Sequence, residues 1–250
     1  MRPGGAPVVL TADRTLMSRH RLLLDGMFVA SQTTAAPRAI VSRLFLSPVR
    51  HVDGQATVAP LGLRRLQAAL LRDGFARDEV ALADQAHLPA VCGPDTRFIG
   101  LSSGEPAGFG MSSSTMAGVA GGMIYPQQLF DEVLAAAHAI RAGHAPAARM
   151  ILGGPGAWQV AQDEALRRSL GLHQVVTGYA EDDIAGLARQ VLAGGELPPV
   201  TQTACPAADR IPPIVGESTM GALELSRGCG LGCDFCTLGG LPMLHLPAAT

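Results

Sequence analysis

The stretch RFIGLSS (residues 97–103) is the clearest sign of how this chain folds. It is a short apolar run followed by small polar residues and glycine, which is typical of a buried strand that ends in a loop. Similar runs recur along the chain and predict further core strands: RAIVSRLFL (38–46), EVALAD (79–84), ARMILGG (148–154) and HQVVTG (173–178). VVLTADRTLMS (8–18) predicts an additional strand at an edge of the sheet.

Segments with helical periodicity lie between these runs. PLGLRRLQAALLRDGF (60–75) places Leu63, Leu66 and Leu70 on one face, and PQQLFDEVLAAAHAIRAG (126–143) carries a similar apolar stripe. Residues 159–170 and 181–193 predict two more helices. Alternating strands and helices indicate an α/β fold with a doubly wound, flavodoxin- or Rossmann-like parallel sheet of about five strands, which binds ligands at the carboxyl ends of its strands.

Changes in composition divide the chain into four parts. We expect an N-terminal extension (1–37), the α/β domain (38–197), a proline-rich linker (198–218) and a short C-terminal segment (219–250). Near the start of the last segment, GALELSR (221–227) predicts a strand that runs directly into a group of cysteines.

The charge and residue content exclude several classes of function. All 19 basic residues are arginine, so chemistry that needs a lysine amine, such as a Schiff base or a P-loop, is excluded. A net charge of −2 without long basic runs argues against nucleic acid as a partner. No secretory signal and no run long enough to span a membrane are evident, which predicts a cytoplasmic protein whose thiols stay reduced.

Three cysteines lie close together near the C-terminus. Cys229, Cys233 and Cys236 have the spacing C-x3-C-x2-C, and the glycines between them let the backbone turn tightly. Three thiolates can hold a 4Fe–4S cluster and leave one iron open. A structural zinc site, completed by Cys205 or His245, is the competing interpretation.

ELSRGCGLGCDFC (224–236) resembles the cluster loop of the radical S-adenosylmethionine superfamily, which follows the first strand of a partial TIM barrel. The resemblance implies that the three cysteines bind a 4Fe–4S cluster and that Phe235 packs beside the adenine of S-adenosylmethionine. It also implies reductive cleavage of that cofactor to a 5′-deoxyadenosyl radical, a small-molecule substrate, and an electron donor such as flavodoxin or ferredoxin. Of the barrel we expect only the first strand and this loop.

The preceding domain resembles the cobalamin-binding-type domains found before many radical S-adenosylmethionine enzymes. FIGLSSGEP, ILGGPGA (151–157) and VVTGYAEDD (175–183) carry this resemblance. It implies cobalamin as a candidate cofactor, with Ser102, Ser103, Gly153 and Gly154 at the cofactor. The D-x-H-x-x-G motif that supplies a cobalt ligand is absent, since Asp84 and His87 have a different spacing and His87 reads as a loop residue. The alternative is a non-catalytic module that binds cobalamin or another small ligand and carries a vestigial cysteine tail.

Overall fold

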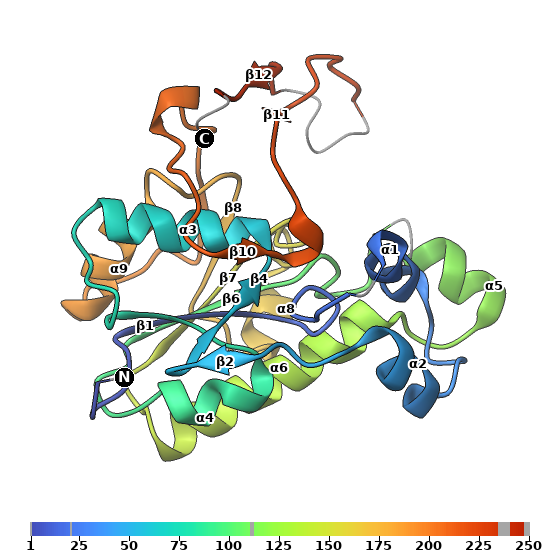
Figure 1. The fold of residues 1–250 in the computed structure, drawn as a ribbon, viewed down its shortest axis with the longest axis horizontal. Helices are drawn as coiled ribbons and strands as arrows, with labels where there is room; N and C mark the ends of the chain where they lie inside the picture. The colour runs from blue at the N-terminus through green and yellow to red at the C-terminus, as the bar shows by residue number, and fades with distance from the viewer. Residues whose placement is uncertain (1, 21, 111–112, 235–240, 248–250) are drawn as a thin grey trace.

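Six parallel strands form the central sheet of the computed structural model, which describes residues 2–20, 22–110, 113–234 and 241–247. The strand order is β5-β1-β6-β7-β8-β9 (Figure 1). Their bounds are β1 (Val8–Ala12), β5 (Val80–Leu82), β6 (Phe98–Ser102), β7 (Arg149–Gly153), β8 (Gln174–Thr177) and β9 (Val200–Gln202). This is an α/β fold with a Rossmann-like sheet, as the sequence predicts.

Helices cover both faces of the sheet, because alternate residues of each strand point to opposite sides. Val9, Ile99 and Met150 are paired across three strands and pack with α4 (Leu88–Val91), α6 (Tyr125–Gly143) and α7 (Trp158–Ala161). On the other face, Leu10 and Ile151 pack with α3 (Leu61–Arg72) and α9 (Ile184–Leu192). Figure 1 shows these helices as two layers with the strands between them.

The prediction of a strand at 38–46 is wrong, because these residues form α2 (Arg38–Phe45). Pro37 stands at its N-cap, where a missing amide hydrogen is harmless. Val41 is buried, whereas Ile40 and Leu44 are 54% and 53% exposed. The apolar run thus reflects an incompletely covered helix, and not a core strand.

The strand expected within 8–18 exists, but its predicted place at a sheet edge is wrong. β1 lies between β5 and β6 and all five of its residues are buried. The sheet also extends past residue 197, since β9 pairs with β8 in parallel. The α/β domain therefore includes part of the expected N-terminal extension and of the expected linker, and neither residue 38 nor residue 197 bounds it.

Two predicted elements are shorter or divided. The helix expected at 159–170 is split into α7 and α8 (Glu164–Ser169), because the Asp163 side chain accepts a hydrogen bond from the Leu166 amide and begins a new helix. The strand expected at 221–227 is limited to β11 (Ser226–Arg227), which pairs with β12 (Leu244–His245) in an antiparallel ribbon.

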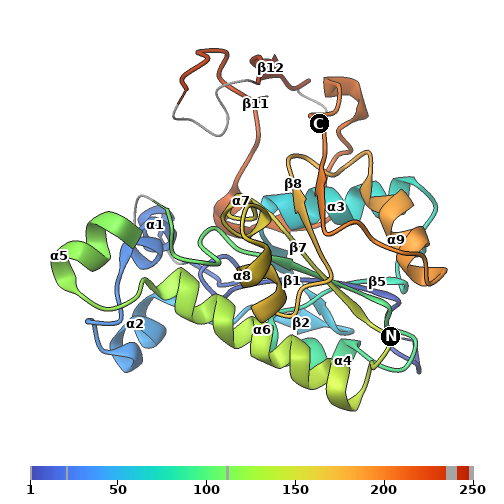
Figure 2. The same ribbon diagram turned by 180° about the vertical axis from the view of Figure 1, so that it is seen from behind.

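A side lobe packs on the N-terminal end of α6. It contains α1 (Leu23–Ser31), α2 and α5 (Gly118–Ala120), and Figures 1 and 2 both show α1 beside α5. Val29, Val41 and Leu46 join Tyr125 and Leu129 of α6 in a small core of their own. No helix in the described part of the chain has the length and apolar character that a membrane span requires.

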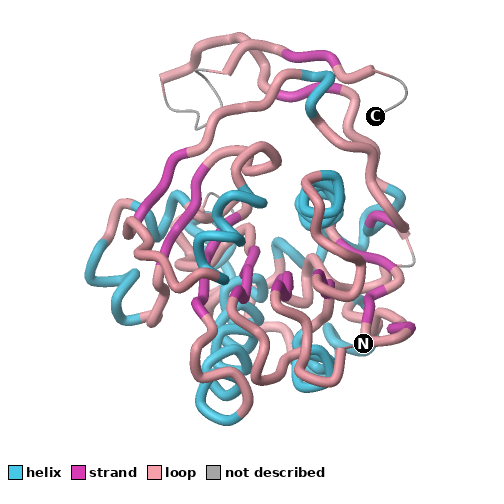
Figure 3. Tube along the Cα trace, turned by 90° about the vertical axis from the view of Figure 1, so that its left-hand side faces the viewer, coloured by secondary structure: helices cyan, strands magenta, loops and turns pink. Residues whose placement is uncertain are grey.

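The chain after β9 lies against α3, and Figure 3 shows loop segments that arch over the helices and strands on the side where the C-terminus lies. β10 (Glu217–Ser218) pairs in parallel with β4 (Val58–Ala59), just before α3. Arg64, Arg65 and Arg72 of α3 donate hydrogen bonds to backbone carbonyls of Glu217, Pro212 and Arg210, respectively. The segment expected to be a linker, residues 198–218, thus contacts the α/β domain at several points. Upstream, β2 (His51–Val52) and β3 (Gln55–Ala56) form a short hairpin.

Candidate functional site

The carboxyl ends of β6 and β7 bring four predicted site residues together. Ser102 and Gly153 are register partners, and Ser103 and Gly154 directly follow them. Gly154 has a φ of +86°, and a Cβ at this position would lie 2.3 Å from the Ser102 Oγ. Ser103 is fully buried, and its Oγ accepts a hydrogen bond of 3.2 Å from the Glu105 amide. These contacts order the two loops, and contact with a cofactor stays a prediction.

Asp13 is a further candidate site residue, outside the set predicted from the sequence. It follows β1, next to Ser102, whose carbonyl accepts the Asp13 amide at 3.3 Å. The side chain is fully buried; Oδ1 accepts hydrogen bonds from the amide and hydroxyl of Thr15, whereas Oδ2 has no hydrogen-bond partner among the described residues. Burial raises the pKa of Asp13, and the hydrogen bonds from Thr15 oppose this.

Asp13 lies at the switch point of the sheet, where a ligand is expected to bind. β1 joins β5 on one side and β6 on the other, and the strand order reverses at this point. In open α/β sheets, ligands bind in the crevice at such a switch point. Asp13 and Thr15 are spaced like the aspartate and the histidine of D-x-H-x-x-G, with threonine in place of the histidine. This loop therefore offers a carboxylate and a hydroxyl, but no imidazole.

Glu105 anchors the small-residue segment that follows β6. Its carboxylate accepts hydrogen bonds from the Gly110 amide at 2.9 Å, the Ser113 hydroxyl at 3.2 Å and the Gln159 side-chain amide at 2.9 Å. Gln159 in turn accepts from the amides of Ala107 and Phe109. The part near residue 105 thus stays at the carboxyl edge of the sheet, while α5 lies beside α1 (Figure 1).

The described part of the cysteine loop has the backbone that the sequence predicts. Gly228, Gly230 and Gly232 have φ values of 68°, 70° and 65°, the left-handed region that side chains disfavour. Cys229 is exposed and Cys233 is partly exposed. Phe235 and Cys236 lie outside the described residues, so two of the three predicted ligands can be placed.

The competing zinc interpretation finds no support within the described ranges. Cys205 is partly buried, and its thiol contacts the Pro206 carbonyl oxygen at 3.7 Å. His245 pairs with Ser226 in the ribbon. Among the described His, Cys, Asp and Glu side chains, neither residue lies in a three-ligand group with Cys229 and Cys233.

Arg227 attaches the cysteine loop to the α/β domain. This residue stands two positions before Cys229, and its side chain is 2% exposed. It forms ion pairs with Glu181 and with Glu224, the latter at 2.8 Å, and its guanidinium lies 4.3 Å from the centre of the Tyr179 ring. Tyr179 and Glu181 follow β8 in the chain, so Arg227 holds the base of the loop at the carboxyl edge of the sheet.

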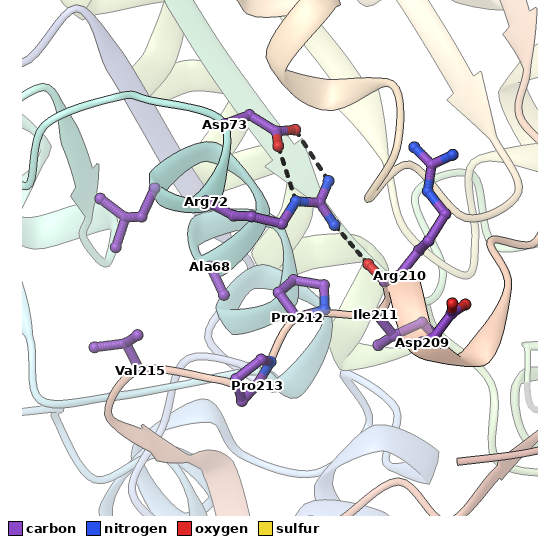
Figure 4. A pocket seen from close by; sticks show the side chains of 10 residues that line it. Ala68, Arg72, Asp73, Asp209, Arg210, Ile211, Pro212, Pro213 and Val215 are labelled. Atoms are coloured by element: carbon purple, nitrogen blue, oxygen red, sulfur yellow. Dashed lines mark hydrogen bonds and ion pairs between the residues drawn. The ribbon is translucent and has the colours of Figure 1, made fainter. Parts of the chain in front are cut away.

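A cavity of about 660 Å³ lies elsewhere, between α3 and residues 209–215 (Figure 4). Arg72 on its wall donates two hydrogen bonds to Asp73, at 2.8 and 3.0 Å, and one to the Arg210 carbonyl. The side chains of Arg72 and Asp73 on this wall therefore pair with each other. None of the residues predicted to bind a cofactor or metal lines the cavity.

Three further side chains, none of them predicted to bind a metal, meet beside the sheet. His51 of β2, Asp84 after β5 and His87 each offer one ligand atom, and these atoms lie within 4.8 Å of one another. His87, which the sequence predicts to be a loop residue, ends a 3₁₀ turn (Gln85–His87) that Asp84 caps. The D-x-x-H spacing was the available signal, while His51 is brought in by the hairpin, over a distance in sequence that no local pattern reveals.

Comparison with protein-family models, curated proteins and solved structures finds no match to this chain.

Proposed function

We propose that this chain is a radical S-adenosylmethionine module: an α/β domain of the cobalamin-binding type joined to a loop that holds a 4Fe–4S cluster. The observation that carries the proposal is the C-x3-C-x2-C spacing of Cys229, Cys233 and Cys236 on a loop with three left-handed glycines. Thiolates in a tight, accessible loop are the donors that such a cluster prefers. We place this chemistry in the reducing cytoplasm, where free thiols persist.

In this proposal the cysteines, Phe235 and Arg227 have separate roles. The three cysteines would hold the cluster, and Phe235 would pack beside the adenine of S-adenosylmethionine. When bound, the two cofactors would supply a 5′-deoxyadenosyl radical for hydrogen abstraction from a small-molecule substrate, with an electron from a donor such as flavodoxin or ferredoxin. Arg227 would fix the base of the loop through Glu181 and Glu224. The carboxyl edge of the sheet would thereby face the cluster.

Anaerobic reconstitution with iron and sulfide tests the cysteine site. We expect about four irons and four sulfides per chain. Cys229→Ser, Cys233→Ser and Cys236→Ser should each lose most of this iron, and Cys205→Ser should retain it. Cys92→Ser is a second control. The Cys92 thiol is buried, and burial raises its pKa to about 12, so it does not supply the thiolate that iron needs. Equal iron in all five variants, or bound zinc in place of iron, would overturn the assignment.

A second candidate function is binding of a small ligand at the switch point of the sheet, without catalysis by this chain. The buried Asp13 carboxylate, with Oδ2 unpartnered among the described residues, favours it. For cobalamin the described switch-point residues fit only in part, since Thr15 cannot replace an imidazole as cobalt ligand. Titration with hydroxocobalamin, followed by the visible spectrum, tests this function, and an unchanged spectrum together with free cobalamin after gel filtration would reject it.

A further inference from the structure

We propose that His51, Asp84 and His87 form a binding site for one divalent transition metal ion of the zinc class. Two imidazoles and a carboxylate are ligands that zinc and its neighbours accept, and three protein ligands leave a position open for water. The site is separate from the cysteine loop, so it does not rest on the function proposed above.

The distances suit a shared ion after a small adjustment. Asp84 Oδ1 lies 3.8 Å from His51 Nε2 and 2.6 Å from His87 Nδ1. Ligand atoms around a tetrahedral ion with bonds of about 2.0–2.1 Å are separated by about 3.3 Å. The contact between Asp84 and His51 is thus slightly long. The contact between Asp84 and His87, where a hydrogen now lies between the two atoms, would lengthen when an ion replaces that hydrogen.

His51 is prepared as a ligand by its surroundings. Its Nδ1 lies 3.1 Å from the Val49 carbonyl oxygen, and its Nε2 accepts the Asp84 amide at 3.3 Å. Since a carbonyl can only accept, the proton must be on Nδ1, so Nε2 carries a lone pair. This lone pair now accepts the backbone amide of Asp84, and an ion bound to Nε2 would replace that long hydrogen bond. A backbone carbonyl is one of the outer partners that commonly accept a hydrogen bond from the second ring nitrogen of a histidine that binds a metal.

The hairpin that carries His51 is fastened to the sheet. Asp53 and Gly54 at its turn have φ values of 50° and 76°, as a two-residue turn with a left-handed backbone requires. The Gln55 side chain then pairs with the free edge of β5: it donates to the Val80 carbonyl and accepts from the Leu82 amide, both at 2.9 Å. This contact sets His51 beside the end of β5, where Asp84 follows.

His87 is the ligand that would move. The imidazole rings of His51 and His87 are stacked, with centres 3.6 Å apart and an interplanar angle of 14°. An ion lies in the plane of each imidazole that binds it, so two nearly parallel rings cannot both bind until one turns. The side chains of His51 and Asp84 are only 5% and 9% exposed, whereas that of His87 is 40% exposed and can rotate. Its exposed side would leave room for a coordinated water.

Zinc and cobalt binding to the full chain test the proposal. The chain with Cys229, Cys233 and Cys236 all changed to Ser is dialysed against Zn²⁺, and bound metal is measured by elemental analysis and calorimetry. We expect one equivalent, with a spectrum of the Co²⁺ form that lacks sulfur-to-metal charge-transfer bands. In this background, His51→Ala and His87→Ala should each weaken zinc binding at least about tenfold. Loss of a residue that only supports a ligand already lowers metal affinity by about ten- to a hundredfold, and loss of a ligand itself should cost no less.

Two further variants separate loss of a ligand from a change in the fold or in histidine content. Asp84→Asn retains an acceptor for the His87 amide and so preserves the cap, but removes the charge and should weaken zinc binding as well. His144→Ala changes an exposed histidine outside the group and should bind as before. Zinc bound only when the three cysteines are present, or equal affinity in the His51 and His87 variants, would overturn the proposal and leave the stacked pair as a packing contact.

Discussion

At the scale of single residues, Arg227 links the sequence motif to the rest of the fold. Its side chain is 2% exposed and that of its partner Glu181 is 5% exposed. Removal of one member of a buried pair leaves an uncompensated charge, which costs about 3–5 kcal/mol. Exposed pairs contribute less than about 1 kcal/mol, because solvent screens them. The two kinds of pair in this chain should therefore respond very differently to truncation.

We predict that Arg227→Ala opens the base of the cysteine loop. Hydrogen exchange of the amides of residues 224–228 should accelerate about a hundredfold, as a loss of roughly 3 kcal/mol implies. Arg2→Ala is the control, since Arg2 pairs with Glu79 at 2.9 Å with side chains 40% and 33% exposed. Exchange that is unchanged by Arg227→Ala would show that the ion pair does not hold the loop.

His173 gives the protein a defined pH dependence. Its Nδ1 accepts the Met150 amide at 3.1 Å, which fixes the neutral ring. Burial, with Arg141 and Arg149 nearby, lowers its pKa from the ordinary 6.5 to about 4. Between these values the unfolded chain binds a proton that the folded chain does not, so the free energy of unfolding falls as the pH is lowered from about 6.5 to about 4.

Urea unfolding at a series of pH values in this window measures the effect. His173→Asn keeps an acceptor for the Met150 amide but cannot titrate, so its stability should fall less steeply over the same range. Parallel curves for the two proteins would mean that other groups cause the dependence.

At the scale of elements, the turn after β7 depends on the absence of a side chain. Gly154→Ala should lower the free energy of unfolding by about 1–3 kcal/mol, because φ is +86° and the new Cβ would meet the Ser102 Oγ. Gly186→Ala in α9, where nothing lies within 4 Å, should be neutral or stabilising by up to about 1 kcal/mol. Chemical denaturation measures both changes, and a Gly154→Ala protein as stable as the parent would contradict the crowding.

Elements could be predicted where the local pattern and the tertiary surroundings agree. The helix at 60–75 and the strands at 79–84, 97–103, 148–154 and 173–178 are confirmed within a few residues. RAIVSRLFL failed because a short apolar run does not separate a strand from a helix. β9 was hidden by flanking prolines, which an edge strand tolerates.

At the scale of the whole molecule, apolar strands alternate with amphipathic helices along the chain. This alternation predicts parallel strands with helices on both faces of the sheet, so the doubly wound fold was predictable. The position of β1 between β5 and β6 could not be predicted, because these pairings join segments that are far apart in the chain. The same limit applies to the candidate sites. Ser102 and Gly153 could be associated as strand ends, whereas the contact of Arg227 with Glu181 spans 46 residues and leaves no local pattern.

The most direct measurement is electron paramagnetic resonance of the reconstituted chain after reduction with dithionite, recorded with and without S-adenosylmethionine. The proposed function predicts a reduced 4Fe–4S signal whose shape changes when S-adenosylmethionine is added, since the iron without a cysteine ligand would bind it. Cys229→Ser should abolish the signal and Cys205→Ser should preserve it. A cluster signal that is indifferent to S-adenosylmethionine, or no cluster signal at all, would contradict the assignment of the cysteine loop.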